Sequence, residues 1–91
     1  MLTEIPIDGI LDLHQFHPRD VIDLVDEYLS ECFIKGIKTV RIITGKGKGV
    51  IKARVFHHLK KHPNVIEIRE NDYSNGNWGV LIIFLKEEKK G

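Results

Sequence analysis

Hydrophobic residues recur at helical spacing in two stretches of the chain. The first stretch has four of them at intervals of four, four and three: Val21, Val25, Leu29 and Cys32. Such intervals put the side chains on one face of a helix, with Pro18 suited to its first turn and Gly36 to its end. The second stretch has the set Ile51, Val55, Phe56 and Leu59. The pattern predicts helices over about 18–35 and 50–61, with Lys52 pointing to solvent from the second.

Four further segments have the β-branched or alternating composition of strands. The first is the apolar run Ile10–Leu13, which we expect to form a strand that ends at His14. The others are Thr39–Ile43, Val65–Arg69 and Gly79–Leu85. Turn-forming residues at 71–76 separate the last two, so the order is β-α-β-α-β-β. Right-handed crossovers make the first three strands parallel, and the short last connection makes the fourth antiparallel to the third. Two crossovers of the same hand place both helices on one face. We therefore expect an α/β two-layer sandwich of the α+β type, with a four-stranded mixed sheet.

The composition is that of a soluble globular domain. Of the 91 residues, 42% are hydrophobic and 30% are charged, which excludes a disordered tail, a coiled-coil rod and a collagen-like repeat. The longest apolar run, Val80–Leu85, is far shorter than the roughly 20 residues of a membrane helix, and Met1–Glu4 lacks the layout of a secretory signal. Cys32 is the only cysteine, which excludes an internal disulfide and a cysteine zinc site. We expect a monomeric, cytoplasmic protein of one domain, without membrane contact.

Charge is distributed unevenly along the chain, although the net charge is only +1. Residues 1–34 contain eight acidic side chains and a single basic one, Arg19. Residues 35–61 contain nine basic side chains and no acidic one, and residues 62–91 contain five acidic and four basic ones. A basic stretch of this length favours an anionic partner such as nucleic acid. The alternative is that the fold brings the acidic segment beside the basic one and cancels its charge.

Asp12 and His14 form the first candidate site. They flank Leu13 at the end of the first predicted strand, so both side chains project to the same side. Open α/β sheets commonly bind ligands at the carboxyl ends of their parallel strands. A carboxylate can hold a neighbouring imidazole in one tautomer and prepare it as a general acid or base near neutral pH. The pair therefore indicates catalysis, and the alternative is two polar residues that merely end a strand.

A glycine-rich basic loop after the second strand forms the second candidate site: Thr44, Gly45, Lys46, Gly47, Lys48 and Gly49. Alternate glycines allow the backbone to approach a ligand closely, and the N-terminus of the following helix favours a phosphate. The spacing fits neither a Walker loop nor a dinucleotide fingerprint, so a nucleotide cofactor is not expected. A phosphodiester backbone is the better anion, and a solvated connection is the alternative.

Both candidate sites lie at the carboxyl ends of parallel strands, so the predicted topology brings them to one edge of the sheet, with Lys52 and Arg54 nearby on the second helix. Trp78, in the predicted hairpin, either stacks on a nucleobase or covers the core. His58 and His62 are four residues apart but lack an evident third ligand, so zinc is not expected. A divalent cation, Mg²⁺ or Mn²⁺, held with the help of Asp12 is the alternative to metal-independent chemistry.

Two motifs, in this order, resemble the Smr (small MutS-related) domain family. They are Leu11–His14 before the first helix and Ile42–Gly47 before the second, and a glycine-bearing hairpin follows them. The resemblance covers residues 10–86, which leaves 1–9 as an N-terminal extension and 87–91 as a charged tail. It implies a fold like that of the C-terminal domain of translation initiation factor 3. It also implies nucleic-acid binding, with structure-dependent nicking or endonuclease activity in several members.

By the same resemblance, Asp12 and His14 take part in cleavage, and the loop residues Gly45, Lys46 and Gly47 contact the substrate. Three places depart from the family pattern. Gln15 replaces the glycine that commonly follows the motif histidine, and Thr44 stands where many members have a histidine. The third is 76–81, which carries bulky residues where the family usually has small ones.

We therefore expect a nucleic-acid-binding domain that nicks or cleaves phosphodiester bonds in DNA or RNA, with His14 as general acid or base and Asp12 orienting it. Lys46, Lys48 and the loop amides would stabilise charge on the phosphate. One alternative is a non-catalytic module that binds nucleic-acid junctions or ribosomal RNA. Another is a protein-interaction domain that uses the acidic residues of the first helix, among them Asp20, Asp23 and Glu27.

Overall fold

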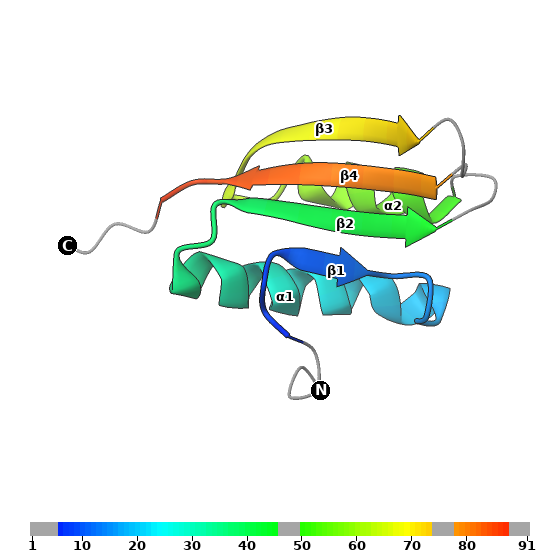
Figure 1. The fold of residues 1–91 in the computed structure, drawn as a ribbon, viewed down its shortest axis with the longest axis horizontal. Helices are drawn as coiled ribbons and strands as arrows, with labels where there is room; N and C mark the ends of the chain where they lie inside the picture. The colour runs from blue at the N-terminus through cyan, green and yellow to red at the C-terminus, as the bar shows by residue number, and fades with distance from the viewer. Residues whose placement is uncertain (1–5, 46–49, 74–77, 88–91) are drawn as a thin grey trace.

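The chain forms a four-stranded sheet and two main helices, and the computed structural model describes residues 6–45, 50–73 and 78–87. Of residues 71–73 and 78 it describes the backbone only. The elements, in chain order, are β1 (Ile10–Asp12), the short 3₁₀ helix η2 (Pro18–Asp20), α1 (Val21–Lys35), β2 (Thr39–Gly45), α2 (Val50–Leu59), β3 (Val65–Tyr73) and β4 (Trp78–Leu85) (Figure 1). This is the order of helices and strands that the sequence predicts.

The sheet has the strand order β1-β2-β4-β3. β1 pairs with β2 in parallel, and β4 is antiparallel to both of its neighbours. The first three strands consequently run in the same direction, and the mixed sheet predicted from the sequence is confirmed. α1 and α2 pack against each other and cover one face of the sheet (Figure 1). The carboxyl ends of β1 and β2 therefore lie at the same end of the sheet, beside the start of α2.

The core lies between this face of the sheet and the two helices. All four residues of the predicted stripe on α1 are buried, and they meet inward-facing residues of the strands: Leu11, Val40, Ile42, Leu81, Ile83 and Leu85. On α2, Val55 and Leu59 are buried, and Ile51 and Phe56 pack against the same core. Burying one such side chain contributes about 1.5–3 kcal/mol to folding. The hydrophobic positions thus fix which face of each element points inward.

Tyr28 ties α1 to the start of β1. Its side chain is fully buried, and its hydroxyl accepts the backbone N–H of Gly9 at 3.0 Å and lies 3.1 Å from the carbonyl oxygen of Ile10. Burial raises the pKa of this phenol above its ordinary value, so the hydroxyl keeps the proton that it donates. Because β1 has only three residues, this anchor helps to place Asp12 and the turn that follows it.

Cys32 gives the protein a predictable weakness at alkaline pH. The thiol is fully buried, and burial raises its pKa from 9.0 to about 11. Unfolding restores the ordinary pKa, so the stability that the protonated thiol contributes is complete below pH 9 and is lost as the pH rises to about 11. We expect the free energy of unfolding in urea to fall by about 2 kcal/mol over this interval. The free energy of unfolding of Cys32→Ala should fall less steeply over the same pH interval. Equal slopes for the two proteins would show that the Cys32 thiol is not the source of the loss.

Several boundaries differ from the sequence-based expectation; β2, for example, runs to Gly45 rather than ending at Ile43. β1 ends at Asp12 rather than at His14, and α2 ends at Leu59, since a turn of 3₁₀ type follows it. The prediction of a turn at 71–76 was wrong for residues 71–73. These residues belong to β3 and pair with Trp78, Gly79 and Val80 of β4. Pairing along a buried neighbouring strand satisfies their backbone groups, and this outweighs the turn preference of Asn and Asp. The remaining residues of that segment, 74–77, lie outside the described part of the chain.

Candidate active site at the end of the sheet

Asp12 and His14 form a hydrogen-bonded pair where β1 ends. The backbone N–H of Leu13 donates to the carbonyl oxygen of Ile43 on β2 at 2.8 Å, and the Leu13 side chain is buried. The chain then turns, and Oδ1 of Asp12 accepts the backbone N–H of His14 at 3.0 Å. The same oxygen lies 2.5 Å from Nδ1 of the His14 ring. The predicted pairing of the two side chains is confirmed, although a turn held by Asp12 brings them together rather than strand alternation alone.

This pair is open to solvent and has a defined orientation. The side chains of His14 and Asp12 are 42% and 38% exposed. A carboxylate that accepts from Nδ1 holds the neutral ring in the tautomer whose lone pair is on Nε2. The arrangement is that of a general base or acid with its orienting carboxylate.

Gly45, the last residue of β2, lies directly against His14. It has a φ of +93°, and a Cβ atom at this position would lie 3.2 Å from Cβ of His14. Only glycine takes both the backbone conformation and the close approach without strain. The first glycine of the loop therefore lies beside Cα and Cβ of His14, so the start of the loop and the Asp12–His14 pair meet as the sequence predicts. We call this end of the sheet, formed by Asp12, His14, Thr44, Gly45 and Gly79, the rim.

A β-bulge at Thr44 completes the rim. Ile43 pairs with Val80 and Gly45 pairs with Gly79, so Thr44 is the extra residue between them. Its side chain is buried, and its hydroxyl donates to the carbonyl oxygen of Gly79 at 3.0 Å. The sequence places Thr44 among the phosphate-binding residues. In the structure its hydroxyl bonds to the protein, and the bulge re-aims the end of β2 towards His14.

Lys52 and Arg54 extend the site onto α2. Lys52 was expected to point to solvent; this was wrong, because its side chain is only 16% exposed and Nζ lies 3.5 Å from Oε2 of Glu70 on β3. Its methylene stem lies beside Gly79 of the rim, an instance of an apolar stem that covers protein surface. Arg54 is exposed and donates from Nη1 to the carbonyl oxygen of Pro18 at 3.3 Å. It thus lies on the side of α2 that faces the start of η2.

The other predicted site residues lie wholly or partly outside the described part of the chain. Lys46, Gly47, Lys48 and Gly49 lie outside the described part of the chain. Trp78 begins β4, where its backbone pairs with Tyr73, and its side chain is likewise outside the described part. The described structure therefore brings together the Asp12–His14 pair, Thr44 and Gly45 at the start of the loop, and Lys52.

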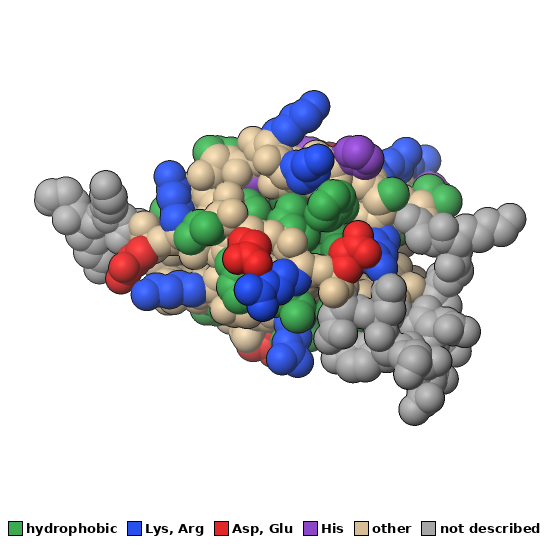
Figure 2. Space-filling model, turned by 90° about the horizontal axis from the view of Figure 1, so that it is seen from above, with side chains coloured by type: hydrophobic (Ala, Val, Ile, Leu, Met, Phe, Trp, Pro, Cys, Tyr) green, Lys and Arg blue, Asp and Glu red, His purple; other side chains and the backbone are tan. Residues whose placement is uncertain are grey.

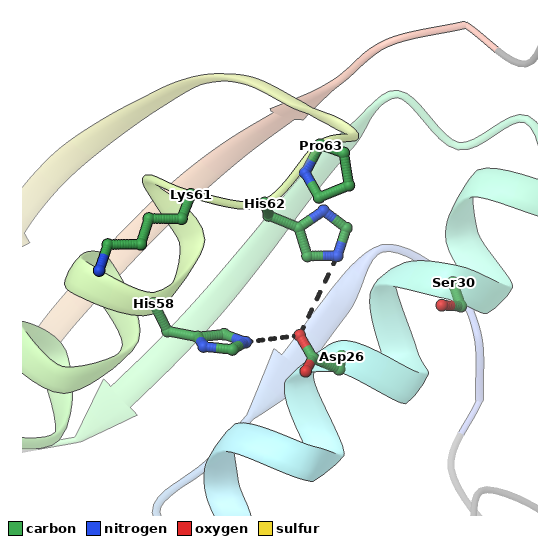
Figure 3. A pocket seen from close by; sticks show the side chains of 6 residues that line it. All are labelled: Asp26, Ser30, His58, Lys61, His62 and Pro63. Carbon is green, nitrogen blue, oxygen red and sulfur yellow. Dashed lines mark hydrogen bonds and ion pairs between the residues drawn. The ribbon is translucent and has the colours of Figure 1, made fainter.

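A second carboxylate–imidazole cluster, which the sequence did not predict, joins the two helices (Figure 3). Oδ1 of Asp26 on α1 lies 2.8 Å from Nε2 of His58 and 4.0 Å from Nε2 of His62. These residues line a pocket together with Ser30, Lys61 and Pro63. The two histidines are four residues apart in the sequence, a spacing that brings side chains to one side of a helix. Which carboxylate they contact depends on how the helices pack.

This cluster does not have the features of a metal site. Nδ1 of His62 accepts the backbone N–H of Asn64 at 3.1 Å, so the neutral ring carries its proton on Nε2, the nitrogen that faces Asp26. Within residues 6–45, 50–73 and 78–87, no group of three His, Cys, Asp or Glu side chains has the arrangement to hold a metal ion.

Among the helices of these same ranges, none is long and apolar enough to cross a membrane.

The fold and the rim define a small two-layer α/β domain with a carboxylate–imidazole pair at the carboxyl end of its parallel strands. Comparison with known families is decisive: the Smr domain model matches residues 11–86. The chain belongs to the Smr domain family, and the resemblance seen in the two motifs is confirmed.

The curated relatives support the same assignment. "Endonuclease MutS2" of Caldicellulosiruptor bescii is 36% identical over 87 residues, which are 96% of this chain and 11% of that protein. "Endonuclease MutS2" of Staphylococcus carnosus is 38% identical over 76 residues, which are 84% of this chain and 10% of that protein. The chain therefore spans about a tenth of the length of these relatives, and what it matches in them is the Smr domain.

Two solved structures confirm the fold. The Smr domain of Thermus thermophilus MutS2 superposes with a TM-score of 0.76 at 23% identity, covering 86% of this chain and 98% of that one. YdaL, a stand-alone small MutS-related protein from Escherichia coli, superposes with a TM-score of 0.77 at 19% identity, covering 90% of this chain and 67% of that one.

Proposed function

We propose that this Smr domain binds nucleic acid at the rim and cleaves a phosphodiester bond there, with His14 as the acid–base group. The observation that carries the proposal is the contact between the exposed Asp12–His14 pair and Gly45, the residue from which the glycine-rich loop starts. A phosphate bound by that loop would lie beside the imidazole. The name of the MutS2 relatives, which are called endonucleases, supports the same reaction class.

In the proposed reaction, Nε2 of His14 removes the proton from the attacking hydroxyl, which is water or, in RNA, the neighbouring 2′-OH. The nucleophile's oxygen bonds to phosphorus, and the bond from phosphorus to the leaving oxygen breaks. The proton taken up by His14, or one from solvent, then goes to that leaving oxygen. Asp12 keeps the ring oriented and stabilises its positive charge, and the cationic loop offsets the charge that builds up on the phosphate.

The donor set at the rim favours chemistry without a resident metal. Asp12 and His14 supply one carboxylate and one imidazole, and the Asp12 oxygen that faces the ring already accepts two hydrogen bonds. Mg²⁺ prefers six oxygen ligands, several of them water or substrate phosphate. We therefore assign no step to a cation, and the experiment below includes a chelator.

The second candidate function is that of a non-catalytic binding module. It is favoured by the fact that Lys52 and Thr44 are bonded to other groups of the protein. Lys52 is paired with Glu70, and the hydroxyl of Thr44 is bonded to Gly79. Among the described residues, His14 and its partner Asp12 are thus the exposed acid–base groups of the rim. Such a module would bind junctions or structured RNA through charge and shape, and it would not cut them.

Incubation of the purified protein with branched DNA and with structured RNA, in EDTA and in Mn²⁺, separates these two functions. We expect cleavage of at least one substrate that persists in EDTA. RNA products that end in a 2′,3′-cyclic phosphate would identify the 2′-OH as nucleophile, and products with a 5′-phosphate would identify water. Tight binding without product under any condition would contradict catalysis and establish the binding module.

A further inference from the structure

The outward side of α2 and the turn after it form a basic surface that includes Arg54 and continues beyond the rim. Its exposed residues are Val50, Ala53, Arg54, His57, Lys60 and Lys61. At about 100° per residue these six positions fall within an arc of about 120°. The arc contains no acidic residue, since the chain has none from Lys35 to Lys61. Four residues separate Gly45 from the start of α2, so the arc starts near the rim and runs away from it.

The charges on this arc are not cancelled by carboxylates. Arg54 donates to a backbone carbonyl, that of Pro18, and Nζ of Lys60 lies 5.6 Å from the centre of the Phe56 ring. Such contacts hold a side chain in place and leave its charge uncompensated. Within the described residues, Arg54, Lys60 and Lys61 form no ion pair. The surface therefore presents a positive potential to solvent.

α1 borders this arc with the opposite charge. Its exposed side carries Asp23 and Glu27, and Asp26 lies at the boundary, where it bonds to His58 of α2 (Figure 3). Among the described residues, the cancellation considered for the acidic and basic segments thus takes place along this line of contact, at Asp26. In Figure 2 blue and purple side chains stand along the upper margin, where α2 lies, with no red among them.

We infer that this arc is a second phosphate-binding surface, along which nucleic acid held at the rim continues as a duplex towards Lys60 and Lys61. The inference rests on the proposed function. The ten residues of α2 span about 15 Å, which matches four to five base pairs at about 3.4 Å each. None of the six exposed residues is Phe, Tyr or Trp, so the arc suits the phosphates of a duplex rather than unstacked bases. The acidic side chains of α1 repel the phosphates of a duplex that would lie along that helix.

Two double substitutions test this inference. One removes two lysine charges from the arc, and the other, as a control, removes two lysine charges from another part of the protein. Lys60→Gln/Lys61→Gln removes two charges from the arc and keeps the stem over Phe56. Lys35→Gln/Lys38→Gln removes two charges at the end of the sheet opposite the rim, where Lys38 lies 3.5 Å from Glu87. Fluorescence anisotropy measures each protein's affinity for labelled DNA and RNA duplexes of 6 and 12 base pairs at several salt concentrations. Lys60→Arg/Lys61→Arg restores the charge, and circular dichroism confirms the fold of each variant.

Wild type should bind the 12-base-pair duplex more tightly than the 6-base-pair one, and Lys60→Gln/Lys61→Gln should lose this gain. For the longer duplex we expect roughly tenfold weaker binding and a slope of log affinity against log salt that is smaller by about 2. The arginine pair should match wild type. Equal behaviour of the two glutamine pairs would overturn the inference and leave the rim intact. A wild type that binds no nucleic acid would overturn the proposed function as well.

Discussion

His14→Ala should reduce the rate of phosphodiester cleavage by about 10²–10⁴-fold, the usual contribution of a general acid–base group. The affinity for substrate should change less than threefold, because the imidazole supplies a proton-transfer group and the loop supplies the charge that binds phosphate. His14 is 42% exposed, so its removal opens no core cavity. Single-turnover cleavage and anisotropy, measured on the same substrate, separate the two effects.

His58→Ala is the matched control for this substitution. It also removes an imidazole that is bonded to an aspartate, Asp26, but it does so between the helices and away from the rim. Its cleavage rate should equal that of wild type. If His14→Ala cuts as fast as His58→Ala, the rim is not the active site.

Gly45→Ala should impair cleavage by about 10²-fold without any change of an acid–base group. The φ of +93° at this position strains any residue with a Cβ, at a cost of about 1–3 kcal/mol. The added methyl group would also lie 3.2 Å from Cβ of His14, closer than an ordinary contact, so His14 must shift by a few tenths of an ångström. Because misplacement of a catalytic group by about 1 Å can cost about 10²-fold in rate, this shift together with the relaxation of the strained backbone should cost up to this factor.

Gly36→Ala separates the strain from the displacement. Gly36 ends α1 with a φ of +79°, and a Cβ atom there would meet nothing within 4 Å. Thermal unfolding should show a loss of stability in both variants, whereas only Gly45→Ala should lose cleavage. The contact with His14 has no catalytic consequence if the two variants cut equally well under conditions in which both are folded.

Much of this architecture follows from local patterns in the sequence. The spacing of Val21, Val25, Leu29 and Cys32 identifies the buried face of α1 because only a helix brings such positions together. The meeting of His14 with Gly45 follows from topology, since parallel strands joined by right-handed crossovers end at the same edge. Neither conclusion requires knowledge of a long-range side-chain contact.

Other features depend on contacts that a linear pattern does not specify. Lys52 has the helical position of a solvent-facing residue, yet its stem lies beside Gly79 and its charge meets Glu70. The bulge at Thr44 arises from the register between β2 and β4, and the pairing of Asp26 with His58 arises from the packing of α1 on α2. Each of these joins residues that are 18 to 37 positions apart in the chain, where many partners are compatible with the sequence.

The central claim is that nucleic acid meets this protein at the rim. The most direct test is an NMR titration of the ¹⁵N-labelled protein, in EDTA, with an oligonucleotide whose 2′-hydroxyls are methylated, so that the 2′-OH cannot attack. The backbone amide signals of Leu13, His14, Gly45 and Gly79 should shift in proportion to occupancy, while those of Gly36 and Glu87, at the opposite end of the sheet, stay in place. Shifts confined to α1 or to that opposite end would contradict the claim.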